Sequence, residues 1–450
     1  MEKRENWSSR FAYIMTVAGA TVGFGSTWRF PYLVGEYGGG AFLVLFLICI
    51  FLLGVPLIMA ESVIGRRLHQ NNIDSFKGKN ISKWWQIVGY MGCLGAFGIL
   101  AYYMVLGGWV LSYIVNIGEG HLPLDSLITK EVSSNFFESS IGNTRGVIFY
   151  TFCFVLINYY ILAKGIIQGI ENAMKFLMPL LLLLLILVIF RSVTLPNAWL
   201  GVKFYLTPDF SKIGISAILA ALGQVFFALS IGFGVMITLA SYLHKKENIV
   251  VTASTSAVVN TLIAFLAGFM IFPSIFAFGL APDSGPSLVF KVLPIVFSSM
   301  VGGTIFAFCF FSLLLIAALT SSLSIYEVII TSLIEKTNLS RKAATTITLA
   351  VIFILGNIPS ALSYSSFSNI IIFGKNIFDL FDYVSANVLF ISTALLSAIF
   401  VGYVIKDEAL AEITNNHTLP FKLKNFWILW LRYAIPIIII IIFISSIIAI

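Results

Sequence analysis

The feature that most restricts the fold of this chain is a series of eleven apolar segments spread along its whole length. A helix needs roughly 20 apolar residues to cross about 30 Å of hydrocarbon, where lipid cannot satisfy free backbone groups. The composition agrees, because 59% of the 450 residues are hydrophobic and only 10% are charged. The sequence therefore predicts an all-α polytopic membrane protein with eleven transmembrane helices, at about 11–35, 40–66, 88–117, 146–164, 169–191, 215–241, 248–279, 300–334, 342–357, 376–405 and 425–448.

Basic residues gather in the loops on one side of these segments. With the N-terminus in the cytoplasm, about 19 of the 27 Lys and Arg residues lie on the cytoplasmic side, as the positive-inside rule requires. Membrane topology then explains the formal net charge of +7. No stretch joins a basic patch to a nucleic-acid-binding motif, so no nucleic-acid partner is expected.

The middle of the first segment, from Ala18 to Pro31, is unusual for a membrane helix because it holds several glycines and an arginine. Glycine inside a helix costs roughly 1 kcal/mol relative to alanine. Within a bilayer, backbone leaves the helical form only where it is buried in protein or lines a cavity. We interpret Val22 to Gly25 as a break that turns carbonyl and amide groups toward a ligand. The alternative is close packing of small residues against neighbouring helices.

The same motif occurs a second time. Val22-Gly23-Phe24-Gly25 in the first segment returns as Ile231-Gly232-Phe233-Gly234 in the sixth, five segments later. An odd number of segments per half reverses the direction of the second half, which is typical of inverted-repeat transporters with paired broken helices. We expect a single transporter domain over 1–450, with a first repeat at about 11–191, an inverted second repeat at about 215–405 and an extra eleventh helix at about 425–448.

Several longer motifs carry a family resemblance. They are Trp28-Arg29-Phe30-Pro31, Gly38-Gly39-Gly40-Ala41-Phe42, Gly223 through Gly234, and Leu319-Thr320-Ser321-Ser322. In these motifs the chain resembles the neurotransmitter:sodium symporter family and its bacterial amino-acid transporters. The resemblance implies a five-plus-five inverted repeat with helices one and six broken.

The implied function is sodium-coupled import of an amino acid by alternating access. The protein would be a multi-pass protein of the bacterial plasma (inner) membrane, with sodium, a small-molecule amino acid and the lipid bilayer as its partners and no obligatory protein partner. The alternative function is an amino-acid-binding sensor of the same fold without coupled transport. An enzyme is not expected, because the segments contain no metal cluster, GxSxG motif or paired aspartates.

The substrate site follows from the resemblance. Tyr103 matches the tyrosine that holds the substrate carboxylate, and the alternative is an ordinary interfacial tyrosine. Gly23 stands where monoamine carriers have an aspartate, so the substrate should bring its own carboxylate. No side chain of the implied pocket is ionisable, which favours a neutral aliphatic or aromatic amino acid. The residues implied to bind the substrate are Ala20, Thr21, Gly23, Phe24, Gly25, Ile99, Tyr103, Phe227, Ser230, Phe233, Ser321 and Ile325.

Two sodium sites are implied in the same way. The second site matches the family fully, with carbonyl groups of Gly19, Val22 and Ala317 and hydroxyl groups of Thr320 and Ser321. Such hydroxyl groups often bond back to their own helix instead.

The first sodium site has fewer ligands, namely Thr21, Ser26, Ala228 and Asn260, because a serine replaces the usual asparagine and an alanine replaces a hydroxyl residue. The neighbouring chloride site is also depleted, so we expect chloride-independent transport with a weak or missing first sodium. Alternatively, Thr21, backbone carbonyls and the substrate carboxylate rebuild the site.

Two ion pairs match the gates of the family. Arg29 and Asp382 would close the outer side, with Phe227 as an aromatic lid below them. Arg4 and Glu335 would close the cytoplasmic side, although both could instead be solvated loop charges. Charges inside a membrane are costly unless they are paired, which supports a role for Arg29 and Asp382.

Overall fold

The computed structural model describes residues 5–122, 124, 126–280, 288–416 and 418–448. Within these ranges, nine helices are long and apolar enough to cross a membrane. Each has bounds within five residues of a predicted span, which confirms the prediction for these segments. They cover Gly40–Leu68, Lys83–Gly118, Thr144–Leu162, Ile166–Val193, Ile249–Ala277, Gly303–Thr337, Arg341–Leu362, Ile377–Val404 and Lys424–Ser445.

The two remaining predicted spans are each broken in the middle. The first consists of α1 (Arg10–Thr21) and α2 (Phe30–Glu36), and the sixth of α10 (Ile215–Ala228) and α11 (Val235–Ala240). Neither piece of a broken span is long enough to cross the bilayer alone. Together with the nine long helices, the two pairs account for the eleven predicted spans in the described part of the chain.

Most long spans consist of one or two α-helices. They are α3 (Gly40–Cys49) with α4 (Val55–Leu68), α5 (Gln86–Gly118), α7 (Thr144–Leu162), α8 (Asn172–Val193), α12 (Ile249–Ala277), α14 (Gly303–Thr337), α15 (Arg341–Ile352) with α16 (Ile358–Leu362), α17 (Ile377–Tyr383) with α18 (Phe390–Ile399), and α20 (Lys424–Leu429) with α21 (Ile435–Ile448). The predicted loops contain four further helices: α6 (Lys130–Gly142), α9 (Ala198–Leu206), α13 (Leu293–Ser298) and α19 (Lys406–Ile413).

Proline explains where several spans change their winding. Three α-helices, α2, α4 and α16, carry a proline at their second position: Pro31, Pro56 and Pro359. Each of these helices directly follows a π-helical turn. Proline lacks the backbone N–H and its ring displaces the carbonyl of the preceding turn. A wider turn before the proline accommodates both effects, so the spans at these points bend without being broken.

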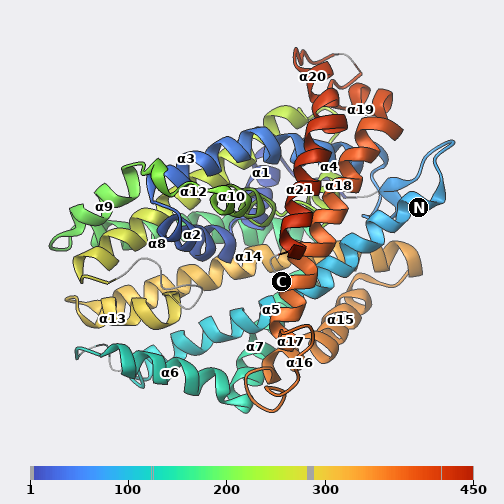
Figure 1. Ribbon diagram of the computed structural model, residues 1–450. Coiled ribbons are helices and arrows are strands. Elements are labelled where there is room, and N and C mark those ends of the chain that lie inside the picture. The colour runs from blue at the N-terminus through green and yellow to red at the C-terminus, as the bar shows by residue number, and fades with distance from the viewer. Residues whose placement is uncertain (1–4, 123, 125, 281–287, 417, 449–450) are drawn as a thin grey trace.

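The centre of the molecule is built from α5 and α14, which pack along each other (Figure 1). Helix α1 contacts both α14 and α12, and α11 contacts α4 and α14. The two broken spans therefore lie against the long central helices. On the other side, α21 lies along α18, as the red and orange ribbons show in Figure 1.

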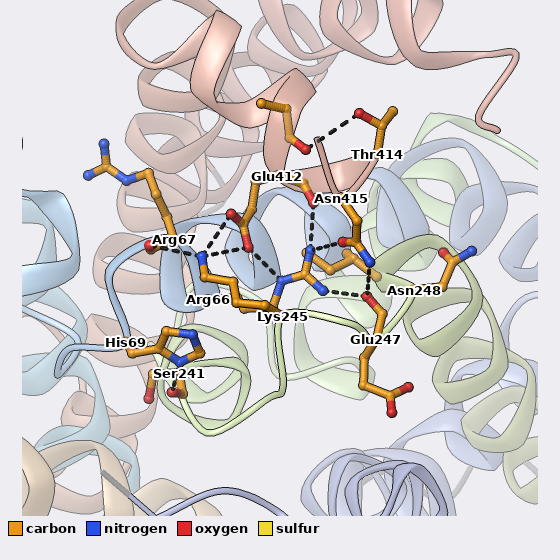
Figure 2. Close-up of polar contacts among 12 residues, drawn as sticks. Arg66, Arg67, His69, Ser241, Lys245, Glu247, Asn248, Glu412, Thr414 and Asn415 are labelled. Carbon is orange, nitrogen blue, oxygen red and sulfur yellow. Dashed lines mark hydrogen bonds and ion pairs between the residues drawn. The ribbon is translucent and has the colours of Figure 1, made fainter. Parts of the chain in front are cut away.

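A polar network ties the ends of three segments together (Figure 2). The Arg66 side chain at the end of α4 is fully buried and its Nε donates to Glu412 of α19 across 2.6 Å. Its guanidinium also donates to the side chain of Asn415 (2.7 Å) and to the backbone carbonyl of Glu247. Lys245 adds an ion pair with Glu412 at 2.9 Å. Because a buried guanidinium needs all its donors satisfied, this network fixes α4, α19 and the loop before α12 relative to one another.

Candidate functional site

The first helix break begins at Val22. Its ψ of 85° ends α1, although its N–H still donates to the carbonyl of Ala18. The chain returns to helical geometry at Phe24 and continues through a π-helical turn at Gly25–Arg29. The predicted break is thus confirmed, and the carbonyl groups of Ala20 and Thr21 at the end of α1 point away from the helix ladder.

The second break follows α10 and depends on left-handed backbone. Ser230, Gly232 and Gly234 have φ values of 52°, 83° and 74°. A Cβ atom on Gly232 would lie 2.2 Å from the carbonyl oxygen of Phe390, so only glycine fits there. The repeated glycine motif therefore marks a break in both spans.

The two breaks meet at the carbonyl of Ala20. Ser230 donates its hydroxyl to this oxygen across 3.0 Å, and Ser321 of α14 donates to it across 3.2 Å. One backbone carbonyl of the first break is thereby bound from the second break and from the central helix. Other groups that the breaks free are bound by neighbouring helices, since the Thr21 carbonyl accepts from Asn260 and the Gly232 N–H donates to Glu61.

A small enclosed cavity lies between the breaks. Its volume is about 10 Å³, close to the space that one water molecule requires. Ten of the twelve predicted substrate residues line it: Thr21, Gly23, Gly25, Ile99, Tyr103, Phe227, Ser230, Phe233, Ser321 and Ile325. The other two are adjacent, since Ala20 supplies the shared carbonyl and the ring of Phe24 lies 4.9 Å from that of Tyr103. The predicted set is therefore brought together in space.

Tyr103 and Gly23 face each other across this cavity. The backbone N–H of Phe24 donates to the Tyr103 hydroxyl at 3.3 Å, and this hydroxyl also hydrogen-bonds with the Ser321 side chain, so a ligand carboxylate would compete with Ser321 for the phenolic proton. A Cβ atom on Gly23 would lie 2.5 Å from the same hydroxyl and 3.1 Å from the Oγ of Ser321. The position tolerates no side chain in this geometry.

A larger cavity of about 660 Å³ lies on the outer side of the site. Arg29 and Asp382 both line it, and Phe227 and Tyr103 line both cavities. The guanidinium of Arg29 lies over the Phe227 ring, 5.0 Å from its centre. Within the described part of the chain no ion pair joins Arg29 to Asp382, so the predicted outer pair shares a cavity without direct contact.

On the opposite side, the segment before α1 packs against the end of the sixth span. Trp7 is only 2% exposed, and its indole N–H donates to the carbonyl of Leu239 across 3.0 Å. The backbone N–H of Trp7 donates to Tyr242, at the end of the sixth span. Glu335 accepts two hydrogen bonds from Asn71, whereas its predicted partner Arg4 lies outside the described residues. The central site therefore adjoins a cavity of about 660 Å³ on the side of Arg29, and on the side of Trp7 a separate hollow of about 550 Å³ is lined by Asn6, His69, His244, Lys245, Lys246 and Glu247.

The residues of the predicted second sodium site lie between α1 and α14. Thr320 donates its hydroxyl to the carbonyls of Ile316 and Ala317, at 3.0 and 3.1 Å. A Cβ atom on Gly19 would lie 3.2 Å from the Thr320 Cβ, which places the end of α1 directly against this hydroxyl residue. In this arrangement the Thr320 hydroxyl bonds back to its own helix, as the alternative interpretation expects, and the Ser321 hydroxyl bonds to the carbonyl of Ala20. Buried hydroxyl and carbonyl oxygens at such a break are nevertheless the kind of group that coordinates sodium in transporters.

The predicted first sodium site is organised by Asn260 of α12. Its amide nitrogen donates to the carbonyls of Thr21 (2.9 Å) and Ala228 (3.0 Å) and to the hydroxyl of Ser26 (3.0 Å). All four predicted residues therefore converge. Three of the oxygens that would bind a cation thus share one NH₂ donor of the protein itself, whereas the Asn260 Oδ1 is buried without a hydrogen-bond partner in the described part of the chain.

Two buried carboxylates have structural partners that the sequence did not reveal. Glu61 of α4 accepts a hydrogen bond from the backbone N–H of Gly232, at 2.8 Å, and so holds the second break. Glu327 of α14 forms a bidentate ion pair with Arg341, at 2.6 and 2.7 Å. The available signal was a carboxylate inside an apolar segment, because such a group is costly without a partner. The sequence around each carboxylate does not indicate which residue is its partner.

Comparison with known proteins gives a consistent result. The profile of the family described as "Sodium:neurotransmitter symporter family" matches residues 4–145 and 135–450. A sodium-dependent transporter of Haemophilus influenzae is 57% identical over 99% of this chain and 98% of its own length. The sodium-dependent transporter YhdH of Bacillus subtilis is 38% identical, with the same coverage of both chains. Among solved structures, MhsT in complex with L-phenylalanine matches with a TM-score of 0.88 and 39% identity, over 99% of this chain and 100% of the other.

Proposed function

The chain belongs to the sodium:neurotransmitter symporter family, whose members are transporters and not enzymes, and we propose that it imports a neutral hydrophobic or aromatic amino acid together with sodium. Alternating access would expose the central site first to the outer cavity and then to the cytoplasm. The outer cavity reaches Tyr103 and Phe227, which also line the central cavity. This shared boundary supports an outward-facing route to the site.

The main support for this substrate class is the set of residues that line the central cavity. It joins a hydroxyl donor on Tyr103 to aromatic and aliphatic walls such as Phe233 and Ile325, and it contains no Asp, Glu, Lys or Arg. In this arrangement the cavity holds no more than about one water molecule, so the site would have to widen to admit a substrate, whose carboxylate would then face the phenolic hydroxyl and whose apolar side chain would face the walls. The match to MhsT, solved with L-phenylalanine, supports the same class.

Sodium is the co-substrate, and we assign it to the second site, between Gly19 and Val22 of the first break and Ala317, Thr320 and Ser321 of α14. Binding there would fix the broken span against the central helix. The two repeats at about 11–191 and 215–405 would then move relative to each other, with the eleventh helix outside the repeat. We place the protein in the bacterial plasma (inner) membrane, with its N-terminus in the cytoplasm.

Equilibrium binding to the purified protein tests the substrate class and the role of sodium. Labelled phenylalanine, leucine and tryptophan should bind in sodium buffer and lose most of their affinity when choline replaces sodium. Lysine and aspartate should not compete. Sodium-independent binding, or competition by the charged amino acids, would contradict the proposal.

A sensor of the same fold would also bind, so a second measurement is needed. Solid-supported membrane recordings should give a substrate-induced inward current that depends on sodium. A brief transient whose decay time does not change with the amount of protein per vesicle would report binding alone and favour the sensor.

A further inference from the structure

Two consecutive asparagines in the loop after α4, Asn71 and Asn72, are both fully buried. Asparagine is seldom buried without a specific role for its amide, because its four hydrogen-bonding positions must be satisfied away from water. These two side chains contact different functional elements. One contacts the predicted inner gate, and the other contacts the second helix break.

Asn71 holds the carboxylate of Glu335. Its backbone N–H and its side-chain amide both donate to the same Glu335 oxygen, at 2.9 and 2.7 Å. The Asn71 Oδ1 accepts the backbone N–H groups of Ile73 and Asp74, at 2.8 and 3.0 Å, which fixes the orientation of the amide. Glu335 lies at the cytoplasmic end of α14, the helix that also carries Thr320 and Ser321.

Asn72 lies between α5 and the second break. Its amide nitrogen donates to the carbonyl of Gly89 across 2.8 Å. A Cβ atom on Gly92 would lie 2.7 Å from this nitrogen, and one on Gly234 would lie 2.7 Å from the amide carbon. The Asn72 Oδ1 is buried and has no hydrogen-bond partner in the described part of the chain. The amide thus contacts the start of α11 with an acceptor that is unused in this arrangement.

We propose that Asn71 and Asn72 are positioning residues that couple the inner gate to the second helix break. The two residues are consecutive and their Cα atoms are held about 3.8 Å apart by a planar peptide unit, so a displacement of the backbone at one of them also displaces the other. When Glu335 is released from Asn71, Asn72 would move away from its present contact with Gly234. As α11 rearranges, the unpaired Oδ1 of Asn72 could then accept a hydrogen bond from a backbone N–H group. The cytoplasmic gate and the unwound segment would then change together.

Hydrogen exchange of the purified protein in sodium buffer without substrate tests this coupling. Asn71→Ala should speed amide exchange in α11 (235–240) about tenfold, the factor that the loss of about one hydrogen bond gives. In the described part of the chain, the Asn71 side chain bonds to Glu335 and to its own loop and has no hydrogen bond to α11. Reciprocally, Asn72→Ala should speed exchange at the end of α14 (330–337). Lys79→Ala, an exposed change in the same loop, should alter neither segment.

Gly92→Ala is a second way to disturb Asn72 without replacing either asparagine, because the new Cβ atom would push against the Asn72 amide. It should also speed exchange at residues 330–337, and the double variant Gly92→Ala/Asn72→Ala should behave like Asn72→Ala alone. The coupling would be overturned if Asn71→Ala changed the exchange rate only at the end of α14 and Asn72→Ala changed it only in α11. Full restoration in the double variant would show that Asn72 merely fills space. The coupling rests on the proposed transport function, but a wrong substrate assignment would leave these exchange rates unaffected.

Discussion

The backbone N–H of Phe24, just beyond the first helix break, donates a hydrogen bond to the hydroxyl of Tyr103 on α5 across 3.3 Å. This contact orients the phenol at the wall of the central cavity. A hydroxyl that accepts one bond from the protein can donate its own proton to an anion. The relationship explains how a neutral side chain could recognise a carboxylate in the middle of the membrane.

Tyr103→Phe should weaken amino-acid binding by about 10- to 100-fold, because a hydrogen bond to a charged group contributes about 1.5–3 kcal/mol. Competition binding in sodium buffer measures the change. Tyr326→Phe is the matched control, since the Tyr326 hydroxyl is buried without a partner in the described residues. Equal affinities for Tyr103→Phe and the unmodified protein would show that the carboxylate binds elsewhere.

Gly23→Asp should abolish transport, because it places an anion beside the bound carboxylate in a site of low dielectric. Gly23→Ala should also impair binding, since its Cβ would lie 2.5 Å from the Tyr103 hydroxyl. Adding Tyr103→Phe removes that hydroxyl, so it should relieve the steric part of the Gly23→Ala defect and none of the Gly23→Asp defect. If Gly23→Asp bound the amino acid with near-normal affinity, the substrate carboxylate would not lie beside Gly23 as proposed.

Thr320→Ala and Ser321→Ala should each abolish sodium-dependent binding while the protein still folds and inserts. Both hydroxyls are proposed sodium ligands between α1 and α14. A sodium titration of substrate binding provides the measurement, and Ser324→Ala on the same helix is the control because its hydroxyl makes only a 3.5 Å bond to its own helix. Sodium dependence retained in both variants would place the ion at another site.

The ion stoichiometry should be as low as one sodium per substrate, and transport should not require chloride. At the first site the amide of Asn260 already donates to three of the oxygens that would bind sodium. One charge across about 100 mV supplies about 2.3 kcal/mol, and a roughly tenfold sodium gradient adds about 1.4 kcal/mol. This energy suffices for accumulation of a few hundred-fold. Reversal potentials in proteoliposomes report the ratio; a value of two, or inhibition when gluconate replaces chloride, would contradict this expectation.

The spans and both breaks could be predicted because their signals are local. About 20 apolar residues define a span, and glycines such as Gly232 mark backbone that must leave the helix. The ion and substrate residues followed from the motif resemblance, and ten of the twelve substrate residues line one cavity in the structure.

Contacts between distant segments could not be predicted in this way. The pairing of Glu327 with Arg341 and the contact of Asn72 with Gly234 depend on how helices pack, and no periodicity in the sequence encodes that packing. The separation of Arg29 from Asp382 reflects the open outer cavity, and a sequence does not specify one conformation of a moving protein. The helices α6, α9, α13 and α19 were missed because they are too short to give the signal of a membrane span.

Uptake of labelled phenylalanine into proteoliposomes tests the central claim most directly. An inward sodium gradient with a negative interior should drive accumulation above the external concentration, and a sodium ionophore should collapse it. Thr320→Ala vesicles with equal protein content serve as the control and should show no accumulation. Binding of phenylalanine without sodium-driven accumulation would contradict the account and leave a sensor of the same fold.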